Sequence, residues 1–221
     1  MNPPFPIELQ KKVEASGVVA VLVIDEVKHA VPVAKALLAG GISAMELTLR
    51  TPAAIEATRA IRSEVPEMLA GVGTVIRPDQ IAEVARAGAA FAVAPGFNRR
   101  VMEAAIAAGM PFAPGIATPT DIESALELGC RLLKYFPAEP FGGMNTLKSM
   151  AAPYQHLGLK YIPLGGLSLK NMASYLESAL IAGLGGSWLA PRDLIKAENW
   201  AAIESNARAA SGVVKEIRAR K

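Results

Sequence analysis

Short runs of Val, Ile, Leu and Ala alternate along the chain with longer helical patterns, at a spacing of about 20 to 25 residues. The apolar runs predict eight strands, at residues 18–24, 44–49, 68–74, 91–94, 111–114, 132–136, 161–164 and 180–184. Strands that alternate with helices form a parallel sheet covered by helices, and eight of them can close a barrel. We therefore expect an α/β protein, a (β/α)8 TIM barrel, with a doubly wound open sheet as the main competitor.

Helical patterns lie between those strands and at both ends of the chain. They cover residues 27–39, 53–64, 79–87, 99–108, 120–128, 144–151 and 169–178, with a leading helix near 7–16 and a trailing one near 200–217. Several follow a start signal such as Thr118-Pro119 and stop at a glycine such as Gly129. The sequence contains no internal linker, so we expect one barrel domain over residues 1–221, with residues 1–17 forming an N-terminal helix that caps the barrel.

The 221-residue chain is 52% hydrophobic, which is ample for one substantial core. No apolar run approaches the roughly 18 residues that span a bilayer, and the start of the chain lacks the basic-then-apolar pattern of a signal peptide. These features predict a soluble, cytoplasmic protein with no membrane partner. The one cysteine, Cys130, follows Gly129 in an Ala/Leu context and is expected to be a small, buried, structural residue.

The formal net charge of +3 comes from the C-terminal tail, because the last seven residues carry the whole excess. A basic helix end without interleaved aromatic residues is typical of a solvated terminus, so no nucleic-acid partner is expected. His29 and His156 stand at no metal-ligand spacing and lack Cys or paired carboxylate neighbours. Both are interpreted as surface histidines, and no metal site is expected.

Lys134 is the only charged residue within the apolar strand predicted at 132–136. Burying an unpaired ammonium group costs several kcal/mol, so such a lysine is expected to lose its proton readily. The neutral amine is a nucleophile toward carbonyl carbon, which makes Schiff-base chemistry the first hypothesis for Lys134. The alternative is a lysine whose stem lies along the core and whose ammonium group reaches water.

Strand alternation places other polar residues on the same side as Lys134. Glu46, Thr48 and Arg50 share one face of a strand, and Lys134 shares a face with Phe136. In a barrel, inward polar residues near the C-terminal mouth are candidates for function. An ion pair that merely fills a layer of the barrel is the structural alternative.

A lysine attacking a 2-oxo acid needs a neighbouring acid/base group and a carboxylate-binding group. Glu46 can shuttle the protons that leave with water, and the planar fork of Arg50 can bind a carboxylate, with the Thr74 hydroxyl as a further donor. Once the iminium forms, its nitrogen accepts electrons as a carbon–carbon bond breaks. The predicted reaction class is a retro-aldol cleavage.

Two glycine pairs supply a candidate phosphate site. Leu164-Gly165-Gly166-Leu167-Ser168 follows the seventh predicted strand, and Gly185-Gly186-Ser187-Trp188 follows the eighth. Phosphate sites of such barrels commonly lie after these two strands, and glycines let backbone amides approach an anion. A helix N-terminus behind each pair is expected to add a favourable dipole. Each pair alone is more typical of a simple turn.

Six segments carry a joint pattern: Glu46-Leu47-Thr48-Leu49-Arg50-Thr51, Gly71-Val72-Gly73-Thr74-Val75, Ala94-Pro95-Gly96, Pro114-Gly115-Ile116-Ala117-Thr118, Lys134-Tyr135-Phe136-Pro137-Ala138-Glu139 and Gly185-Gly186-Ser187-Trp188. From about Val18 to Pro191, in order and spacing, the chain resembles the bacterial 2-dehydro-3-deoxy-phosphogluconate (KDPG) and 4-hydroxy-2-oxoglutarate (KHG) aldolases. The resemblance implies a class I aldolase without metal or cofactor. Such a lyase splits 2-dehydro-3-deoxy-6-phosphogluconate into pyruvate and glyceraldehyde 3-phosphate in the Entner–Doudoroff pathway of carbohydrate metabolism, usually as a homotrimer.

The resemblance also implies roles for individual residues. The Schiff-base lysine falls on Lys134 and the acid/base glutamate on Glu46. The substrate-binding residues are then Arg50, Thr74, Pro95, Phe136, Gly165, Gly166 and Ser187. One departure concerns Leu164, which stands where the family usually has Thr, so a side chain that cannot hydrogen-bond replaces a hydroxyl. Tyr135 is a second, milder departure from the family pattern. It has the opposite strand parity to Lys134, so its side chain is expected to face the helix layer.

Two other functions stay open at this point. The first is the same mechanism on 4-hydroxy-2-oxoglutarate or 2-dehydro-3-deoxy-6-phosphogalactonate, and Leu164 is the residue that raises it. The second is a noncatalytic barrel that binds a phosphosugar. Lys134 together with Glu46 argues against the second, because a sugar binder does not need an amine beside an inward carboxylate.

Overall fold

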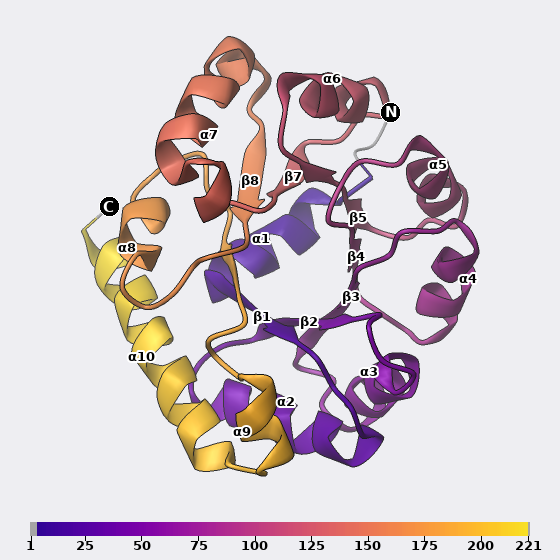
Figure 1. Ribbon diagram of the computed structural model, residues 1–221, viewed down its shortest axis with the longest axis vertical. Helices are drawn as coiled ribbons and strands as arrows, with labels where there is room; N and C mark the ends of the chain where they lie inside the picture. Colours follow the sequence, from indigo (N-terminus) through magenta and orange to yellow (C-terminus); the bar gives the residue numbers. More distant parts are fainter. Residues whose placement is uncertain (1–3, 221) are drawn as a thin grey trace.

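The computed structural model describes residues 4–220 and has an α/β fold in which parallel strands are surrounded by helices (Figure 1). The strands are β1 (Val18–Leu22), β2 (Ala44–Thr48), β3 (Leu69–Gly73), β4 (Ala92–Val93), β5 (Phe112–Ala113), β6 (Gly115–Ile116), β7 (Leu132–Tyr135), β8 (Lys160–Pro163) and β9 (Leu184–Gly186). The predicted α/β class is therefore confirmed.

The strands form two parallel sheets, and the larger one curls into a half-barrel. Its order is β5-β4-β3-β2-β1-β9, and the smaller sheet has the order β6-β7-β8. Two single parallel bridges, Tyr161 to Ile181 and Leu164 to Gly185, connect β8 with the segment that ends in β9. The predicted strand at 111–114 becomes β5, and β6 follows it after Pro114, which has no N–H to donate to a ladder.

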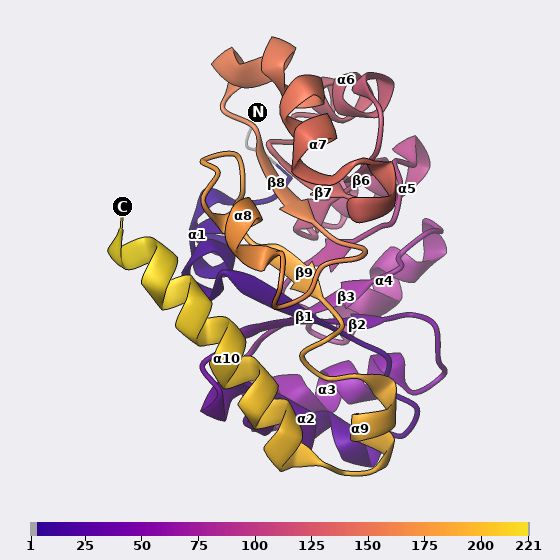
Figure 2. The same ribbon diagram turned by 60° about the vertical axis from the view of Figure 1, so that its left-hand side comes forward.

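The helices lie outside the strands. They are α1 (Ile7–Ser16), α2 (Ala30–Ala39), α3 (Ala54–Glu64), α4 (Asp79–Arg86), α5 (Arg99–Ala107), α6 (Pro119–Glu127), α7 (Gly143–Ala151), α8 (Met172–Leu176), α9 (Arg192–Lys196) and α10 (Trp200–Ala219). Short 3-10 turns complete the chain at η1 (Val27–His29), η2 (Glu139–Phe141) and η3 (Ala152–Leu157). Figure 2 shows the long α10 running past α8 and α2, both of which it contacts. None of the helices within residues 4–220 is long and apolar enough to span a membrane.

Local sequence signals explain where several helices begin and end. Thr118 caps α6 through a capping box with Asp121, in which each side chain satisfies a backbone N–H of the other residue. Gly129, after the last turn of α6, has a φ of 78°, a conformation that glycine adopts without cost. The start and stop signals in the sequence are thus used as predicted at α6.

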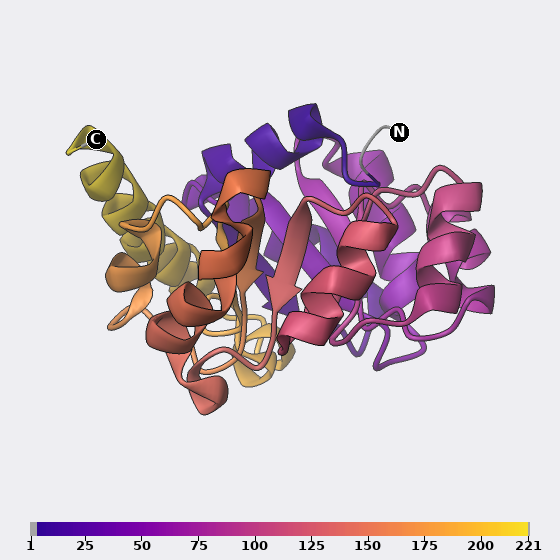
Figure 3. The ribbon, with the colours of Figure 1, turned by 90° about the horizontal axis from the view of Figure 1, so that it is seen from above.

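The apolar side chains form three buried clusters, two between strands and helices and one inside the curled strands. The inner cluster combines inward residues of several strands with Phe5 and Val13 from the N-terminal segment. Figure 3 shows α1, in indigo, lying across the strand ends opposite the arrowheads. The N-terminal segment therefore fills the interior from that end.

The eighth predicted strand is displaced along the chain. It was expected at 180–184, with Gly185 and Gly186 in a following turn, but β9 spans Leu184–Gly186. A Cβ on Gly185 would lie 2.0 Å from Cγ of Leu164, and one on Gly186 would lie 1.9 Å from the Trp188 ring. The glycines are needed inside the strand because neighbouring side chains occupy the space above them.

Two smaller expectations also differ from the structure. His29, interpreted as a surface residue, is only 2% exposed, because residues at and just before the start of α10 cover it: its Nε2 lies 3.2 Å from Oε1 of Glu198 and its ring 6.0 Å from that of Trp200. His156 is exposed, as expected. The short helix α9 had no counterpart among the predicted helices.

Glycines inside the curled strands leave room for large side chains, and this can be tested by Gly71→Ala. A Cβ there would lie 2.3 Å from the buried Phe91 ring, so we expect the free energy of unfolding to fall by about 1 to 3 kcal/mol in urea denaturation. Gly212→Ala is the matched control: Gly212 is exposed within α10 with no atom near its missing Cβ, and the variant should gain up to about 1 kcal/mol. Equal stability of the two variants would contradict the packing argument.

Candidate active site

A cavity of about 340 Å³ lies where several strands end, and most of the predicted site residues meet there. Eight of the nine line it: Lys134, Glu46, Arg50, Thr74, Pro95, Phe136, Gly165 and Ser187. The walls are completed by Val21, Thr48, Leu164 and Gly185. Strand alternation therefore placed the inward residues of β2 and β7 correctly, although these strands belong to different sheets.

Lys134 and Glu46 meet inside this cavity as a buried ion pair. The Lys134 Nζ donates to Glu46 Oε1 at 3.0 Å, and the side chains are 7% and 3% exposed. An unpaired ammonium was expected at Lys134, and this was wrong, because the Glu46 carboxylate compensates its charge. The amine and the acid/base group expected for imine chemistry are thus in direct contact.

The neighbours of the pair explain why both charges fit. Gly73 pairs with Thr48 across β3 and β2, and a Cβ on Gly73 would lie 2.8 Å from Glu46 Oε1. A side chain at position 73 would displace the carboxylate, so this glycine makes room for it. On the other side, the Lys134 Nζ lies 5.8 Å from the centroid of the Phe136 ring, which gives the ammonium a cation–π neighbour.

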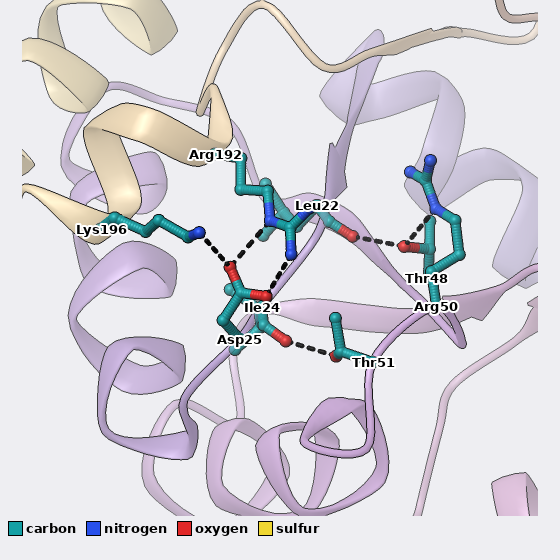
Figure 4. Close-up of polar contacts among 8 residues, drawn as sticks. All are labelled: Leu22, Ile24, Asp25, Thr48, Arg50, Thr51, Arg192 and Lys196. Carbon is teal, nitrogen blue, oxygen red and sulfur yellow. Dashed lines mark hydrogen bonds and ion pairs between the residues drawn. The ribbon is translucent and has the colours of Figure 1, made fainter.

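Arg50 follows β2 at the rim of the cavity, held by Thr48. Its Nε donates to Thr48 Oγ1 at 3.0 Å, and the Thr48 hydroxyl donates to the Leu22 carbonyl at 2.9 Å (Figure 4). Within residues 4–220, the two terminal nitrogens of Arg50 have no hydrogen bond or ion pair with the protein. They are available for an anion in the cavity.

Thr74 follows β3 and has a left-handed backbone with a φ of 63°. This conformation costs a β-branched residue about 1 to 3 kcal/mol, and such strain gathers at functional sites. Its strained backbone and its place in the cavity wall together favour a functional role for Thr74.

Only part of the expected phosphate-binding site lies in the cavity wall. Gly165 and Ser187 line the cavity, but Gly166 does not. Gly166 has a φ of 80°, and a Cβ on it would lie 2.5 Å from Cβ of Glu139, so it serves the turn and its packing. The expected helix dipole is weak, because α8 begins only at Met172 and is five residues long.

Other residues lie outside the cavity. Tyr135 points into the layer between strands and helices, as its parity predicts, and its hydroxyl donates to the Phe141 carbonyl at 3.1 Å. Cys130 is buried, and burial raises the pKa of its thiol to about 12, which fits the structural role expected for it. Among residues 4–220, no three His, Cys, Asp or Glu side chains gather closely enough to hold a metal ion.

Two further residues contribute to the cavity wall, of which Thr48 had no predicted role. Thr48 was placed on the correct face without a role, and its contact with Leu22 joins residues 26 positions apart, which no local pattern reveals. Leu164 was noted as a departure from the family pattern, and the structure now places it in the cavity wall, 5% exposed.

Comparisons with known proteins place the chain in the family that its motifs resemble. The family model of KDPG and KHG aldolase matches residues 9–206. The 2-dehydro-3-deoxy-phosphogluconate aldolase of Dickeya dadantii is 44% identical over 196 residues, covering 89% of this chain and 91% of the relative. The KHG/KDPG aldolase of Escherichia coli K12 is 42% identical over 193 residues, covering 87% and 90%.

A solved structure gives the same result for the fold. The KDPG aldolase from Legionella pneumophila, with pyruvate captured at low pH as a covalent carbinolamine intermediate, superposes with a TM-score of 0.86 at 39% identity. The match covers 91% of this chain and 97% of the other. The chain belongs to the KDPG and KHG aldolase family.

Proposed function

We propose that the protein is a class I aldolase that cleaves 2-dehydro-3-deoxy-6-phosphogluconate reversibly into pyruvate and glyceraldehyde 3-phosphate. The observation that carries this proposal is the buried contact of 3.0 Å between Lys134 Nζ and Glu46 Oε1 in the cavity wall. Family membership and the covalent pyruvate intermediate described for the Legionella relative support it.

Imine formation begins when the neutral Lys134 amine attacks the C2 carbonyl carbon. Because Nζ and Oε1 are in hydrogen-bond contact, the proton that leaves Lys134 has an acceptor in Glu46. Glu46 then returns a proton to the carbinolamine hydroxyl, which departs as water and leaves an iminium on Lys134. Overall, two protons pass from the Lys134 nitrogen to the departing oxygen, the C2–O double bond is replaced by a C2–N double bond, and one water is released.

Carbon–carbon cleavage follows from the positive nitrogen. The C4 hydroxyl loses its proton to a base, for which Glu46 is the carboxylate that lines the cavity, and the C3–C4 bond breaks as the C4–O bond becomes a carbonyl. The electron pair of the broken bond moves into the iminium and forms an enamine, and glyceraldehyde 3-phosphate leaves. Protonation at C3 and hydrolysis then release pyruvate and restore Lys134.

The remaining site residues orient the substrate in this proposal. The free terminal nitrogens of Arg50 and the Thr74 hydroxyl bind the carboxylate, while Pro95 and Phe136 form the pyruvyl wall. Gly165 and Ser187 accept the phosphate end, and Gly166 shapes the turn before α8.

We also infer that the two sheets together form a complete (β/α)8 barrel, with β5 and β6 as halves of one strand. The parallel pairing of successive strands and the two bridges between β8 and the β9 segment support closure. The whole chain is then one domain, in which the N-terminal helix closes the barrel floor. Phe5 and Val13, which share a cluster with inward strand residues, support that capping role.

The partners and location follow the same family. The substrate is a small phosphorylated 2-oxo acid, the protein works in the cytoplasm, and it assembles as a homotrimer. The resemblance to the KDPG and KHG aldolases supports the assembly and the location.

A second candidate substrate is 4-hydroxy-2-oxoglutarate, with 2-dehydro-3-deoxy-6-phosphogalactonate as a third. Leu164 favours the hydroxy-oxoglutarate, because an isobutyl group in the cavity wall cannot hydrogen-bond a sugar hydroxyl. The Escherichia coli relative is itself called a KHG/KDPG aldolase.

Borohydride reduction in the presence of pyruvate tests the proposed covalent step. Peptide mass spectrometry should find a three-carbon adduct on Lys134, because reduction traps the imine on its nitrogen. Lys134→Ala should lose both adduct and cleavage while it stays folded, and Lys170→Ala, at an exposed position, is the control that should keep both. A folded wild-type protein without an adduct would leave the noncatalytic phosphosugar-binding barrel as the better reading.

Glu46→Gln tests the acid/base assignment. The variant keeps the side-chain size but cannot cycle a proton, so imine formation in single-turnover experiments should slow by about 10² to 10⁴ fold. An unchanged rate would assign the proton transfer to another group.

Leu164→Thr tests the origin of substrate preference. The new hydroxyl can bond a substrate hydroxyl, so the ratio of kcat/KM for the phosphogluconate to that for the hydroxy-oxoglutarate should rise about tenfold. Leu164→Val has the shape of Thr without its hydroxyl and serves as the control. If both variants raise the ratio equally, space and not hydrogen bonding sets the preference.

A further inference from the structure

Thr48 lies between Arg50 and the end of β1 and contacts both through one hydroxyl group. It is 3% exposed, and Figure 4 shows its oxygen between the Arg50 guanidinium and the Leu22 carbonyl. The Arg50 Nε is 3.0 Å from Thr48 Oγ1, and that oxygen is 2.9 Å from the Leu22 carbonyl oxygen. A buried polar group in such a position serves either the fold or the neighbour it holds.

The chemistry of these groups fixes the direction of the two hydrogen bonds. The carbonyl of Leu22 can only accept, so the single Thr48 proton is donated to it. The Arg50 Nε can only donate, so it points at the remaining lone pairs of the hydroxyl. The Leu22 carbonyl therefore orients the Thr48 hydroxyl so that its lone pairs face the arginine.

Thr48 holds Arg50 at both ends. The backbone N–H of Arg50 donates to the Thr48 carbonyl at 2.7 Å, while the side chain is held through Nε. Fixing Nε sets the plane of the guanidinium and leaves its two terminal nitrogens directed away from Thr48. A guanidinium group held in this way loses less conformational entropy when it binds both oxygens of a carboxylate.

The carbonyl that orients Thr48 belongs to a segment clamped from two sides. The Thr51 hydroxyl donates to the Ile24 carbonyl, and Asp25 accepts from Arg192 Nε at 2.8 Å and lies 3.5 Å from Lys196 Nζ (Figure 4). Hydrogen bonding from Arg192 lowers the pKa of Asp25 to about 2, so this clamp stays charged at neutral pH. The acceptor for Thr48 is thus held in place by the β2–α3 turn and by α9.

We propose that Thr48 is a positioning residue that orients Arg50 for the carboxylate of the 2-oxo acid substrate. The inference rests on the proposed aldolase function and deepens it, because it assigns part of carboxylate recognition to a residue that does not bind the substrate itself. It extends to the Leu22–Asp25 segment, whose carbonyl groups anchor the threonines.

The test compares a charged and a neutral ligand of the same shape. Borohydride trapping on Lys134 is measured against concentration for pyruvate and for methyl pyruvate, whose ester lacks the carboxylate charge. In Thr48→Val the shape is kept and the hydroxyl is lost. The half-saturating pyruvate concentration should rise about 10- to 100-fold, while that of methyl pyruvate should change less than about threefold. Thr48→Ser, which keeps the hydroxyl, should restore the pyruvate value.

Thr58→Val is the matched control, because it removes a buried hydroxyl that donates to the Ala54 carbonyl within α3 and touches neither Arg50 nor the Leu22–Asp25 segment. It should leave the ratio of the two half-saturating concentrations at the wild-type value. Equal shifts for both ligands in Thr48→Val, or failure of Thr48→Ser to restore the pyruvate value, would overturn the positioning role. So would failure of both Thr48→Val and Thr48→Ala to fold, judged by circular dichroism. A folded wild-type protein with no adduct would instead overturn the aldolase function and this inference with it.

Discussion

The structure is organised around one hydrogen bond between a buried lysine and a buried glutamate. Lys134 comes from β7 and Glu46 from β2, so the contact joins side chains of the two sheets. Each charge would be costly alone, and together they contribute little net stability, because desolvation offsets their attraction. The pair constrains its surroundings: position 73 has no side chain, and apolar residues, including Phe5 from the N-terminal segment, fill the interior below. A contact of low structural value that imposes such conditions is best explained by its chemistry.

Much of this arrangement could be predicted because strands alternate with a period of two. Once β2 and β7 were recognised, the inward positions of Glu46 and Lys134 followed from parity, whatever the errors at the strand ends. The helix boundaries followed from caps, as at Thr118 and Gly129, whose preferences act within a few residues. Both rules are local. They predict the structure correctly because the tertiary packing favours the same local conformations.

The errors arose where residues distant in sequence decide the outcome. Gly185 was assigned to a turn, but Leu164 fills the space above it and makes glycine necessary within the strand. His29 was placed on the surface, but the segment before α10 covers it. The hydrogen bond of 3.0 Å between Lys134 and Glu46 and the hydrogen bond from Arg50 to Thr48 depend on distances between side chains. Strand parity predicts only which face a side chain is on.

The left-handed backbone of Thr74 has a consequence for how this protein can change over time. Backbone strain of this kind lowers the stability of the folded state. Thr74→Gly would relieve the strain, so selection for stability alone is expected to favour it. The same exchange deletes a hydroxyl from the wall of the cavity. In the proposed aldolase, this exchange would raise heat tolerance and lower turnover, so variants selected only for survival at high temperature are expected to become stable but less active.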